Sequence, residues 1–555
     1  MMKLRSKLLV TLATVFTLGA CVSTTPSNSN GSISSPSSTQ ASVSSGETRQ
    51  YNILYIMTDD HAAHAVGAYQ GRFAELDPTP NLDALANSGM RFTNVFVTNS
   101  ICTPSRATIL TGQYSQTNGV LDLRGEIKTP QQHLPRLMKE AGYETAIIGK
   151  WHLKAEPGAF DYYQVLESQG TYFDPEFRTR GAKSWPENET KYQGHSSDVV
   201  TDLSIEWLKN RSSDKPFFLM HQFKAPHDMF QYAPRYEDFL AAETIPEPDD
   251  LYGVAKTFGS IATRGKNDAL RAEIGTSVSR RNNRRNMGID LGVDPNLNEE
   301  EFTRQAYQKY LKAYLRCVKG VDDNVARLIQ TLKDAGQYEN TIIIYTSDQG
   351  MMLGEHDLQD KRWIYDESIR MPFIVKHPDA VAAGVKSDLL INNTDFAPFI
   401  LDLANINAPE YMHGKSFKSA LFGQPPEQWR TASYYRYWTH RAYHDVPAHF
   451  GVRSKDYKLV FYYGTNHMDT PYPFYDKAWI AKTGHANNAI DTPVAWEFYD
   501  LKNDPKEQNN VYQDSRYASV ISALKSELLK QRAKYGETDE KYPRIQKIID
   551  QHWND

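Results

Sequence analysis

The sequence predicts an α/β protein: a large, mostly parallel sheet flanked by helices, followed by a smaller α+β unit. Apolar runs of strand length alternate with amphipathic, helix-like segments over most of the chain. These runs are almost continuously apolar, as expected of strands buried on both faces. After about residue 406 the pattern changes to segments typical of an antiparallel sheet. We therefore expect a main domain at 49–405 and a C-terminal subdomain at 406–555.

Four of the apolar runs lead directly into acidic, basic or imidazole side chains. Ligands of open α/β sheets bind beyond the carboxyl ends of the strands, so four such ends predict one crowded polar site. Any single run could instead end in a solvated turn, and only the coincidence of four indicates a site. The runs are YNILYIMTDD, ending at Asp59 and Asp60; ETAIIGKWH, ending at Lys150 and His152; PFFLMHQFKAPH, continuing to Lys224 and His227; and NTIIIYTSDQG, ending at Asp348 and Gln349.

The acidic residues at these ends predict a metal site. Asp59, Asp60 and Asp348 would repel one another strongly in a partly dry cleft unless a cation compensated them. Carboxylates and the amide oxygen of Gln349 are suitable ligands for a hard divalent cation. Ca²⁺ is the first choice because it tolerates irregular cages, and Mg²⁺ is the second. Zinc-like spacing of imidazole and thiolate ligands is absent from these two motifs.

A helix is predicted at ICTPSRATILTG, residues 101–112, with Thr103 as its cap and Pro104 as its first helical residue. Cys102 would then lie at the helix N-terminus, where amide donors favour anions, and Arg106 adds a cation one turn later. Together with the metal, Lys150 and the histidines, this describes a receptor for a tetrahedral oxyanion, with Cys102 as nucleophile. A structural cysteine in a capped helix is the alternative, which explains Cys102 alone.

The C-terminal part is predicted to contain strands in HFGVRSKDYKLVFYYG and VAWEFYDLKNDP and a helix in ASVISALKSELLKQRAKYG. The segment YYRYWTHRAYHDVPAHFGVR is dense in aromatic and basic groups. It either binds a sugar ring and its neighbouring anions or forms a polar seam between the domains. The candidates for substrate contact are Tyr437, His440, His449 and Arg453.

The first 48 residues are predicted to lie outside the fold. Basic residues precede Leu8–Leu18, an apolar stretch too short to span a bilayer, as in a signal peptide. The stretch ends in Leu-Gly-Ala-Cys21, which resembles the lipobox of bacterial lipoproteins. The resemblance implies a signal peptide at 1–21, acylation of Cys21 and a membrane anchor at the bacterial cell envelope, outer-membrane-bound and facing the periplasm or the surface. An ordinary signal peptide that contains a cysteine is the alternative. Residues 22–48, rich in Ser and Thr, are typical of a flexible tether.

Composition narrows the function classes. A net charge of −5 and 12% aromatic residues are ordinary for a globular protein and do not suggest a nucleic-acid binder or a disordered chain. The chain has 3 cysteines. If Cys21 carries lipid and Cys317 is a buried thiol in an apolar helix, no disulfide framework remains, although export favours disulfides. The presence of Cys102 therefore requires a chemical explanation.

The motif around Cys102 resembles the signature of the type I, formylglycine-dependent sulfatases of the alkaline-phosphatase-like superfamily. The resemblance extends from NILYIMTDDH to WEFYDLKNDPKEQNNVY. It implies an alkaline-phosphatase-like fold, with 49–405 as the catalytic domain, and a sulfuric ester hydrolase activity. It also implies that a separate maturation enzyme oxidises Cys102 to formylglycine (3-oxoalanine). The matching residues are Cys102, Pro104, Ser105, Arg106, Thr111 and Gly112.

The resemblance also assigns roles. The formylglycine hydrate, stabilised by Arg106, is implied to attack sulfur, with His227 protonating the leaving alcohol. Lys150 and His152 are implied to hold the hydrate and assist its regeneration, and Lys361 to grip the sulfate. The implied metal ligands are Asp59, Asp60, Asp348, Gln349 and the group made from Cys102. Many relatives have Asn in place of Gln349. We expect the neighbouring His61, His64 and His356 to be structural.

A sulfatase tethered to a bacterial envelope is expected to act on a sulfated polysaccharide or its oligosaccharides, such as ulvan or a glycosaminoglycan. Three alternatives stay open: a phosphonate or phosphodiester hydrolase of the same superfamily, a non-catalytic surface lipoprotein that binds glycans, and a metal-thiolate enzyme with unmodified Cys102. No nucleic-acid partner is expected.

Overall fold

The structure is a computed structural model. It describes residues 49–181, 183–211, 214–252, 254–265, 292–294, 296–380, 383–441, 444–467, 490–537 and 541–555. The predicted signal peptide, Cys21 and the tether lie outside the described residues. Residues 50–555 form one compact unit, distinct from residues 1–49. The boundary expected between 405 and 406 is not resolved by this division and stays a prediction.

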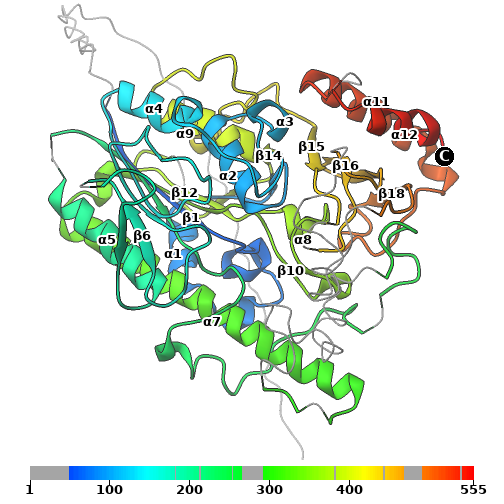
Figure 1. The fold of residues 1–555 in the computed structure, drawn as a ribbon, viewed down its shortest axis with the longest axis horizontal. Coiled ribbons are helices and arrows are strands. Elements are labelled where there is room, and N and C mark those ends of the chain that lie inside the picture. Colours follow the sequence, from blue (N-terminus) through cyan, green and yellow to red (C-terminus); the bar gives the residue numbers. More distant parts are fainter. Residues whose placement is uncertain are drawn as a thin grey trace, which may run out of the picture. The chain divides into compact units, whose positions relative to one another are not determined.

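The central sheet has ten strands in the order β13-β2-β12-β9-β1-β8-β4-β5-β6-β7. Its centre, from β9 to β5, is parallel, whereas β12, β6 and β7 are antiparallel to their neighbours. This is the large, mostly parallel sheet predicted from the apolar runs (Figure 1). The strands are β1 (Asn52–Thr58), β2 (Met90–Phe92), β4 (Glu144–Lys150), β5 (Tyr162–Leu166), β6 (Glu176–Thr179), β7 (Glu189–Lys191), β8 (Phe217–Gln222), β9 (Thr341–Ser347), β12 (Phe373–Lys376) and β13 (Val385–Ser387).

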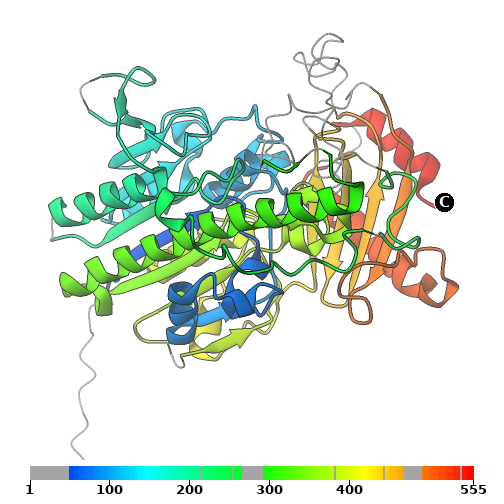
Figure 2. The same ribbon diagram turned by 90° about the horizontal axis from the view of Figure 1, so that it is seen from below.

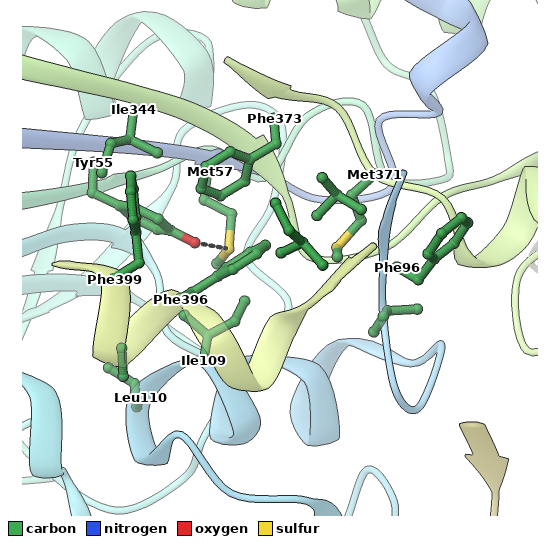
Figure 3. Close-up of a cluster of buried hydrophobic side chains, with 14 of the residues drawn as sticks. Tyr55, Met57, Phe96, Ile109, Leu110, Ile344, Met371, Phe373, Phe396 and Phe399 are labelled. Carbon is green, nitrogen blue, oxygen red and sulfur yellow. Dashed lines mark hydrogen bonds between the residues drawn. The ribbon is translucent and has the colours of Figure 1, made fainter. Parts of the chain in front are cut away.

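Both faces of the sheet are buried. Successive residues of a strand point to opposite sides, so each strand contributes side chains to two cores. In β1, Tyr55 and Met57 belong to the core on one face, and Leu54 and Ile56 to the core on the other. Helices α2 (Cys102–Thr111), α4 (His133–Glu140) and α9 (Phe396–Leu403) cover the first face. Figure 3 shows the contribution of α2 and α9: Ile109, Phe396 and Phe399 pack against Tyr55 and Met57.

The second face is covered by α1 (Pro80–Ser88), α5 (Ser196–Asn210) and the long helix α7 (Glu299–Asp334). Helices α5 and α7 lie side by side along the sheet (Figures 1 and 2). Cys317 lies on α7 and is buried in this core, as predicted for a thiol in an apolar helix.

The C-terminal part forms an antiparallel sheet of four strands, β15 (Ala432–Tyr437), β16 (His449–Ser454), β17 (Tyr457–Tyr462) and β18 (Ala495–Asp500). Helices α11 (Ala518–Lys534) and α12 (Pro543–His552) cover one face, α11 through Ile521, Leu524 and Leu528 and α12 through Ile545 and Ile549. The other face supplies Tyr435 and Tyr437 to the core of the large sheet. The predicted short antiparallel sheet with a packed helix is therefore confirmed (Figure 1).

Short elements complete the described chain. A ribbon of β10 (Met352–Leu353) and β11 (Gln359–Asp360) precedes Lys361, and β3 (Val95–Phe96) pairs with β14 (Ile391–Asn392). The short helices are α3 (Ser115–Asn118) and α8 (Asp366–Ile369). No helix in the described ranges is long and apolar enough to cross a membrane.

Candidate active site

The four chemistry-bearing strand ends meet at one edge of the large sheet. Strands β9, β1, β8 and β4 are consecutive neighbours and run parallel, so their carboxyl ends lie side by side. Asp59 and Asp60 follow β1, Asp348 and Gln349 follow β9, and Lys150 is the last residue of β4. The single polar site expected from the four runs is thus formed by neighbouring strands.

Three buried carboxylates form the centre of this edge. Asp59, Asp60 and Asp348 each offer an oxygen, and these atoms lie within 4.8 Å of one another. Gln349 lies beside them, and its Oε1 atom is buried with no hydrogen-bond partner among the described residues. Oxygen donors of this kind, clustered and partly unsatisfied, fit a divalent cation. We conclude that the four residues are suited to hold one.

The carboxylates are surrounded by buried cations. Lys150 contacts Asp59, Lys361 contacts Asp60, and Arg106 donates from Nε to Asp348 at 2.9 Å. Burial lowers the pKa of Lys361, but Asp60 and other anionic neighbours outweigh it and raise the pKa overall. For Lys150 burial dominates and holds the pKa well below its usual value. A dry site with several cations is suited to stabilising a multiply charged oxyanion.

Arg106 ties the strand ends together. Besides Asp348 from the β9 end, its Nη1 donates to the carbonyl of Lys150 at 2.9 Å and to Oε1 of Gln222, the last residue of β8, at 2.6 Å. Its Nη2 lies 4.0 Å from Asp59. One guanidinium thus contacts groups from four adjacent strands, which the planar fork of Arg allows and the single ammonium of Lys does not.

Cys102 is the first residue of α2 and points into the carboxylate cluster. Its Sγ lies 3.3 Å from Asp59 Oδ1 and 3.5 Å from Gln349 Nε2. Burial raises the pKa of the thiol to about 11, so the unmodified side chain is a neutral thiol at pH 7. The side chain therefore needs another source of nucleophilicity.

The predicted capping of this helix is wrong in detail. The helix begins at Cys102 after Ile101, without a side-chain cap, and Pro104 is its third residue. Thr103 Oγ1 instead donates to the carbonyl of His152 at 3.1 Å. The hydroxyl is used to fix the loop after β4, so it is not available to the helix.

Two half-buried histidines face the cluster. His227 Nε2 lies 3.8 Å from Asp60, and its Nδ1 lies 2.7 Å from the Asp228 carboxylate. Burial, Lys361 and Lys150 lower the pKa of His227 to about 4, and Asp228 opposes them. Burial, followed by Lys150 and Arg106, holds the pKa of His152 well below its usual value.

A cavity of about 660 Å³ opens onto these groups. This volume lies within the range of about 300–1,000 Å³ typical of ligand pockets. Its lining includes the site residues Cys102, His152, His227, Asp228 and Lys361 together with Ile101, Trp151, Asp360, Arg362 and His444, a group that we name the inner end. The other lining residues, which we name the outer part, are Leu123, Lys154, Leu166, Glu167, Ser168, Gln169, Arg178, Trp185 and Pro186.

The four residues predicted to contact substrate do not line this cavity. Tyr437, His440 and His449 are buried, and both ring nitrogens of His440 and Nδ1 of His449 bond to main-chain groups. Arg453 forms an ion pair with Asp366 at 2.9 Å. The small sheet has an apolar core on each of its faces, so the aromatic side chains of this segment are used inside the protein. This placement corrects the expectation that the four residues contact substrate.

The ion pair of Arg453 is one of several contacts that hold the segment after Lys361. Tyr435 on β15 donates to the carbonyl of Arg362 at 2.7 Å, and Lys458 on β17 donates to the carbonyl of Ile364 at 2.8 Å. With Arg453 on β16, three strands of the small sheet each contact at least one residue of 362–366. The small sheet therefore positions Lys361 indirectly.

The remaining histidines next to the motifs have structural contacts and do not line the cavity described here. His61 contacts the Tyr345 hydroxyl at 2.6 Å, His64 contacts Glu355 at 3.1 Å, and His356 contacts Asp250 at 3.2 Å.

Three residues of the site were not predicted. Asp228 contacts His227, Gln222 accepts from Arg106, and Gln169 Oε1 accepts from Lys150 at 2.5 Å. The acidic residue directly after His227 could have been noticed in KAPHD. Gln169 lies in a loop after β5, where nothing in the sequence indicates its proximity to Lys150.

Comparison with known proteins decides the family. Residues 51–406 match the family described as Sulfatase, and residues 354–479 and 487–534 match the C-terminal region of N-sulphoglucosamine sulphohydrolase. The chain belongs to the sulfatase family. It is a sulfuric ester hydrolase, and the family implies formylglycine and a divalent metal site.

Relatives match over nearly the whole chain. An N-acetylglucosamine-6-O-sulfatase of Bacteroides thetaiotaomicron is 35% identical over 89% of this chain and 88% of its own. An ulvan-active sulfatase of Formosa agariphila is 28% identical over 88% of this chain and 83% of its own.

Solved structures agree with the fold of this sulfatase. One, described as a complex with its substrate D-glucosamine-2-N,6-O-disulfate, has a TM-score of 0.76 and 34% identity and covers 89% of this chain and 99% of its own. A phosphonate monoester hydrolase from Silicibacter pomeroyi, with a TM-score of 0.63, 20% identity and coverage of 88% and 96%, shares the fold alone.

Proposed function

We propose that this sulfatase removes 6-O-sulfate from glucosamine residues of a sulfated glycan of the glycosaminoglycan type. The observation that carries the proposal is similarity over about nine-tenths of the chain to an N-acetylglucosamine-6-O-sulfatase, at 35% identity. The cavity suits such a ligand, because it combines apolar walls with a cationic inner end. Ulvan is the second candidate substrate, supported by the weaker similarity to an ulvan-active sulfatase.

The chain's own residues provide binding and proton transfer. Lys150 and Lys361 neutralise charge on the sulfuryl oxygens, while Arg106 orients Asp348. His227 Nε2 delivers a proton to the departing sugar oxygen, and Asp228 accepts a hydrogen bond from Nδ1 and so fixes that orientation. His152 accepts a proton when sulfate is released. Formylglycine made from Cys102, together with a cation held by Asp59, Asp60, Asp348 and Gln349, would supply a hydroxyl nucleophile of lowered pKa.

The cation is proposed to be Ca²⁺. The donors are three carboxylates and one amide, and Ca²⁺ tolerates a mixed, irregular set of oxygen donors better than Mg²⁺. Metal-depleted protein reloaded with one ion at a time tests this: Mg²⁺ restoring full activity at lower concentration than Ca²⁺ contradicts it.

A substrate panel tests the function. Wild type and Cys102→Ala are incubated with 6-O-sulfated glucosamine saccharides, ulvan oligosaccharides, an aryl sulfate and a phosphodiester, and the products are identified. We expect sulfate release from the glucosamine 6-position in the wild type alone. A preference for the diester contradicts the sulfatase activity, and glycan binding without turnover in both proteins supports a binding role instead.

The modification of Cys102 and acylation of Cys21 are tested separately. Mass spectrometry of the Cys102 peptide from active protein is expected to show the aldehyde, and an alkylatable thiol in fully active protein contradicts it.

Anchoring at the cell envelope is proposed from the lipobox-like sequence. Cys21→Ala should abolish fatty-acid labelling and release the protein from the membrane fraction; unchanged labelling refutes it.

A further inference from the structure

The outer part of the cavity is not used by the proposed chemistry. Cys102, His152, His227 and Lys361 belong to the inner end, whereas the outer wall includes Leu166, Arg178 and Trp185 from β5, β6 and the loop before β7. This wall combines aliphatic, aromatic and cationic side chains, namely Leu166, Trp185 and Arg178. Such a combination is suited to an amphipathic ring that carries a negative charge.

Arg178 on β6 has an unused donor. Both of its carboxylate contacts involve Nη2, which lies 3.6 Å from Glu167 and 3.1 Å from Glu189. Its Nη1 is buried and has no hydrogen-bond partner among the described residues. Arg178 also lines the cavity, so its guanidinium can pair with an anionic oxygen of a bound ligand.

Trp185 stands beside this guanidinium and is held in place by the wall. The centre of the Arg178 guanidinium lies 5.5 Å from the centroid of the Trp185 ring, and the Tyr163 ring meets Trp185 edge-on with centroids 6.1 Å apart. Asn188 fixes the same loop by donating to Tyr163 Oη at 3.0 Å and to the carbonyl of Thr179 at 2.7 Å. Trp185 is therefore an ordered aromatic side chain on the cavity wall.

The outer wall is continuous with the sulfate end. Residues 166–169, which begin at the last residue of β5, all line the cavity. At one end of this segment Glu167 contacts Arg178, and at the other Gln169 Oε1 accepts from Lys150 at 2.5 Å. A ligand that places its sulfate near Lys150 would therefore extend along this segment toward Arg178.

We propose that Arg178 and Trp185 form a subsite for the sugar next to the one that loses sulfate, and that this sugar carries an anionic oxygen. Trp185 contacts the sugar ring, and the Arg178 guanidinium donates to a carboxylate or sulfate on it. The proposal rests on the proposed function, and it makes the natural substrate an oligosaccharide with charge on the neighbouring residue.

The test compares substrates that share the cleaved group. They are a 6-O-sulfated glucosamine monosaccharide and three disaccharides whose neighbouring sugar bears a carboxylate, a sulfate or no charge. We expect the wild type to have a higher kcat/KM for the charged disaccharides than for the neutral one. Arg178→Gln should lower kcat/KM about 10- to 100-fold more for the charged disaccharides than for the monosaccharide, because a charged hydrogen bond is lost. The charged disaccharide whose kcat/KM falls more in Arg178→Gln identifies the anion that Arg178 binds.

Two further variants separate ring contact from charge and from folding. Trp185→Ala should lower kcat/KM for all three disaccharides relative to the monosaccharide, because contact with the ring does not depend on charge. Lys191→Gln on β7 is the matched control, since it removes the same charge from an exposed side chain that pairs with Glu176 and does not line the cavity. It should leave every ratio unchanged.

Equal loss of activity of Arg178→Gln on all four substrates, or equal kcat/KM of the wild type for the mono- and disaccharides, overturns the subsite. If the wild type cleaves no 6-O-sulfated glucosamine substrate, the proposed function fails. The same ratios measured on the sulfated oligosaccharides that it does cleave then decide the subsite. Arg178→Lys keeps the charge but loses the planar guanidinium with its several donors, so it provides a second test if Arg178→Gln folds poorly.

Discussion

Replacing Asp228 by Asn tests whether His227 is the acid that protonates the leaving group. The carboxylate lies 2.7 Å from His227 Nδ1 and raises the pKa of an imidazole that burial, Lys361 and Lys150 lower to about 4. Asn keeps the shape but removes the charge. A hydrogen bond to a charged group contributes about 1.5–3 kcal/mol, and 1.4 kcal/mol is a tenfold change in rate. The main-chain carbonyl of Asp228, 2.5 Å from the same nitrogen, remains as an acceptor, so the lower part of this range applies.

We therefore expect kcat/KM for a sugar sulfate to fall about 10- to 30-fold in Asp228→Asn. A nitrophenyl sulfate should be affected much less, because nitrophenolate departs without needing a proton. Both substrates are assayed with wild type, Asp228→Asn and the control Asp238→Asn, an exposed aspartate outside the cavity. An equal loss on both substrates, or none on the sugar sulfate, would refute the assignment of His227 as acid.

Three other predictions concern stability and metal binding. Gly149→Ala would place a Cβ 1.8 Å from the carbonyl oxygen of Gln222, at a residue with a φ of +107°. We therefore expect the free energy of unfolding, measured by urea titration, to fall by about 3 kcal/mol. A loss below about 0.5 kcal/mol contradicts the close approach of β4 to β8. Burial lowers the pKa of His221 from 6.5 to about 3, so below pH 6.5 the unfolded chain binds a proton that the folded chain does not. Stability should therefore fall by about 2 kcal/mol from pH 7 to pH 5 through this group, a loss that His221→Gln should lack; identical pH slopes in both proteins contradict it. Gln349→Ala should weaken Ca²⁺ binding about 10- to 100-fold in calorimetric titration, and unchanged affinity excludes Gln349 as a ligand.

The large sheet and the centre of the site could be predicted because both depend on local patterns. A strand buried on two faces must be apolar throughout, so the first polar residues after it, such as Asp59 or Asp348, are conspicuous in the sequence. The convergence of these ends then follows from the rule that parallel strands present their carboxyl ends at one edge. Lys361 was reached only through the resemblance to a family, because it follows a short ribbon instead of a core strand.

The outer cavity and the small sheet show where such patterns fail. Arg178 and Trp185 lie on β6, the strand next to the edge of the sheet, and on the loop after it, where half-exposed residues follow no apolar period. Tyr437 and His449 were expected at a substrate surface because they are aromatic or polar. The small sheet has a core on each face, however, and its side chains are enclosed on both sides. Burial on two faces cannot be inferred from strands whose residues are mostly amphipathic.

The three contacts from β15, β16 and β17 to residues 362–366 have a practical consequence for truncation and engineering. Lys361, which we propose neutralises charge on the sulfuryl oxygens, comes immediately before this segment. Cutting the chain near residue 406 would therefore not yield a minimal enzyme, even though every proposed reacting group precedes that point. Conversely, substitutions in the small sheet offer a way to tune how tightly sulfate is held without altering any residue that meets the substrate.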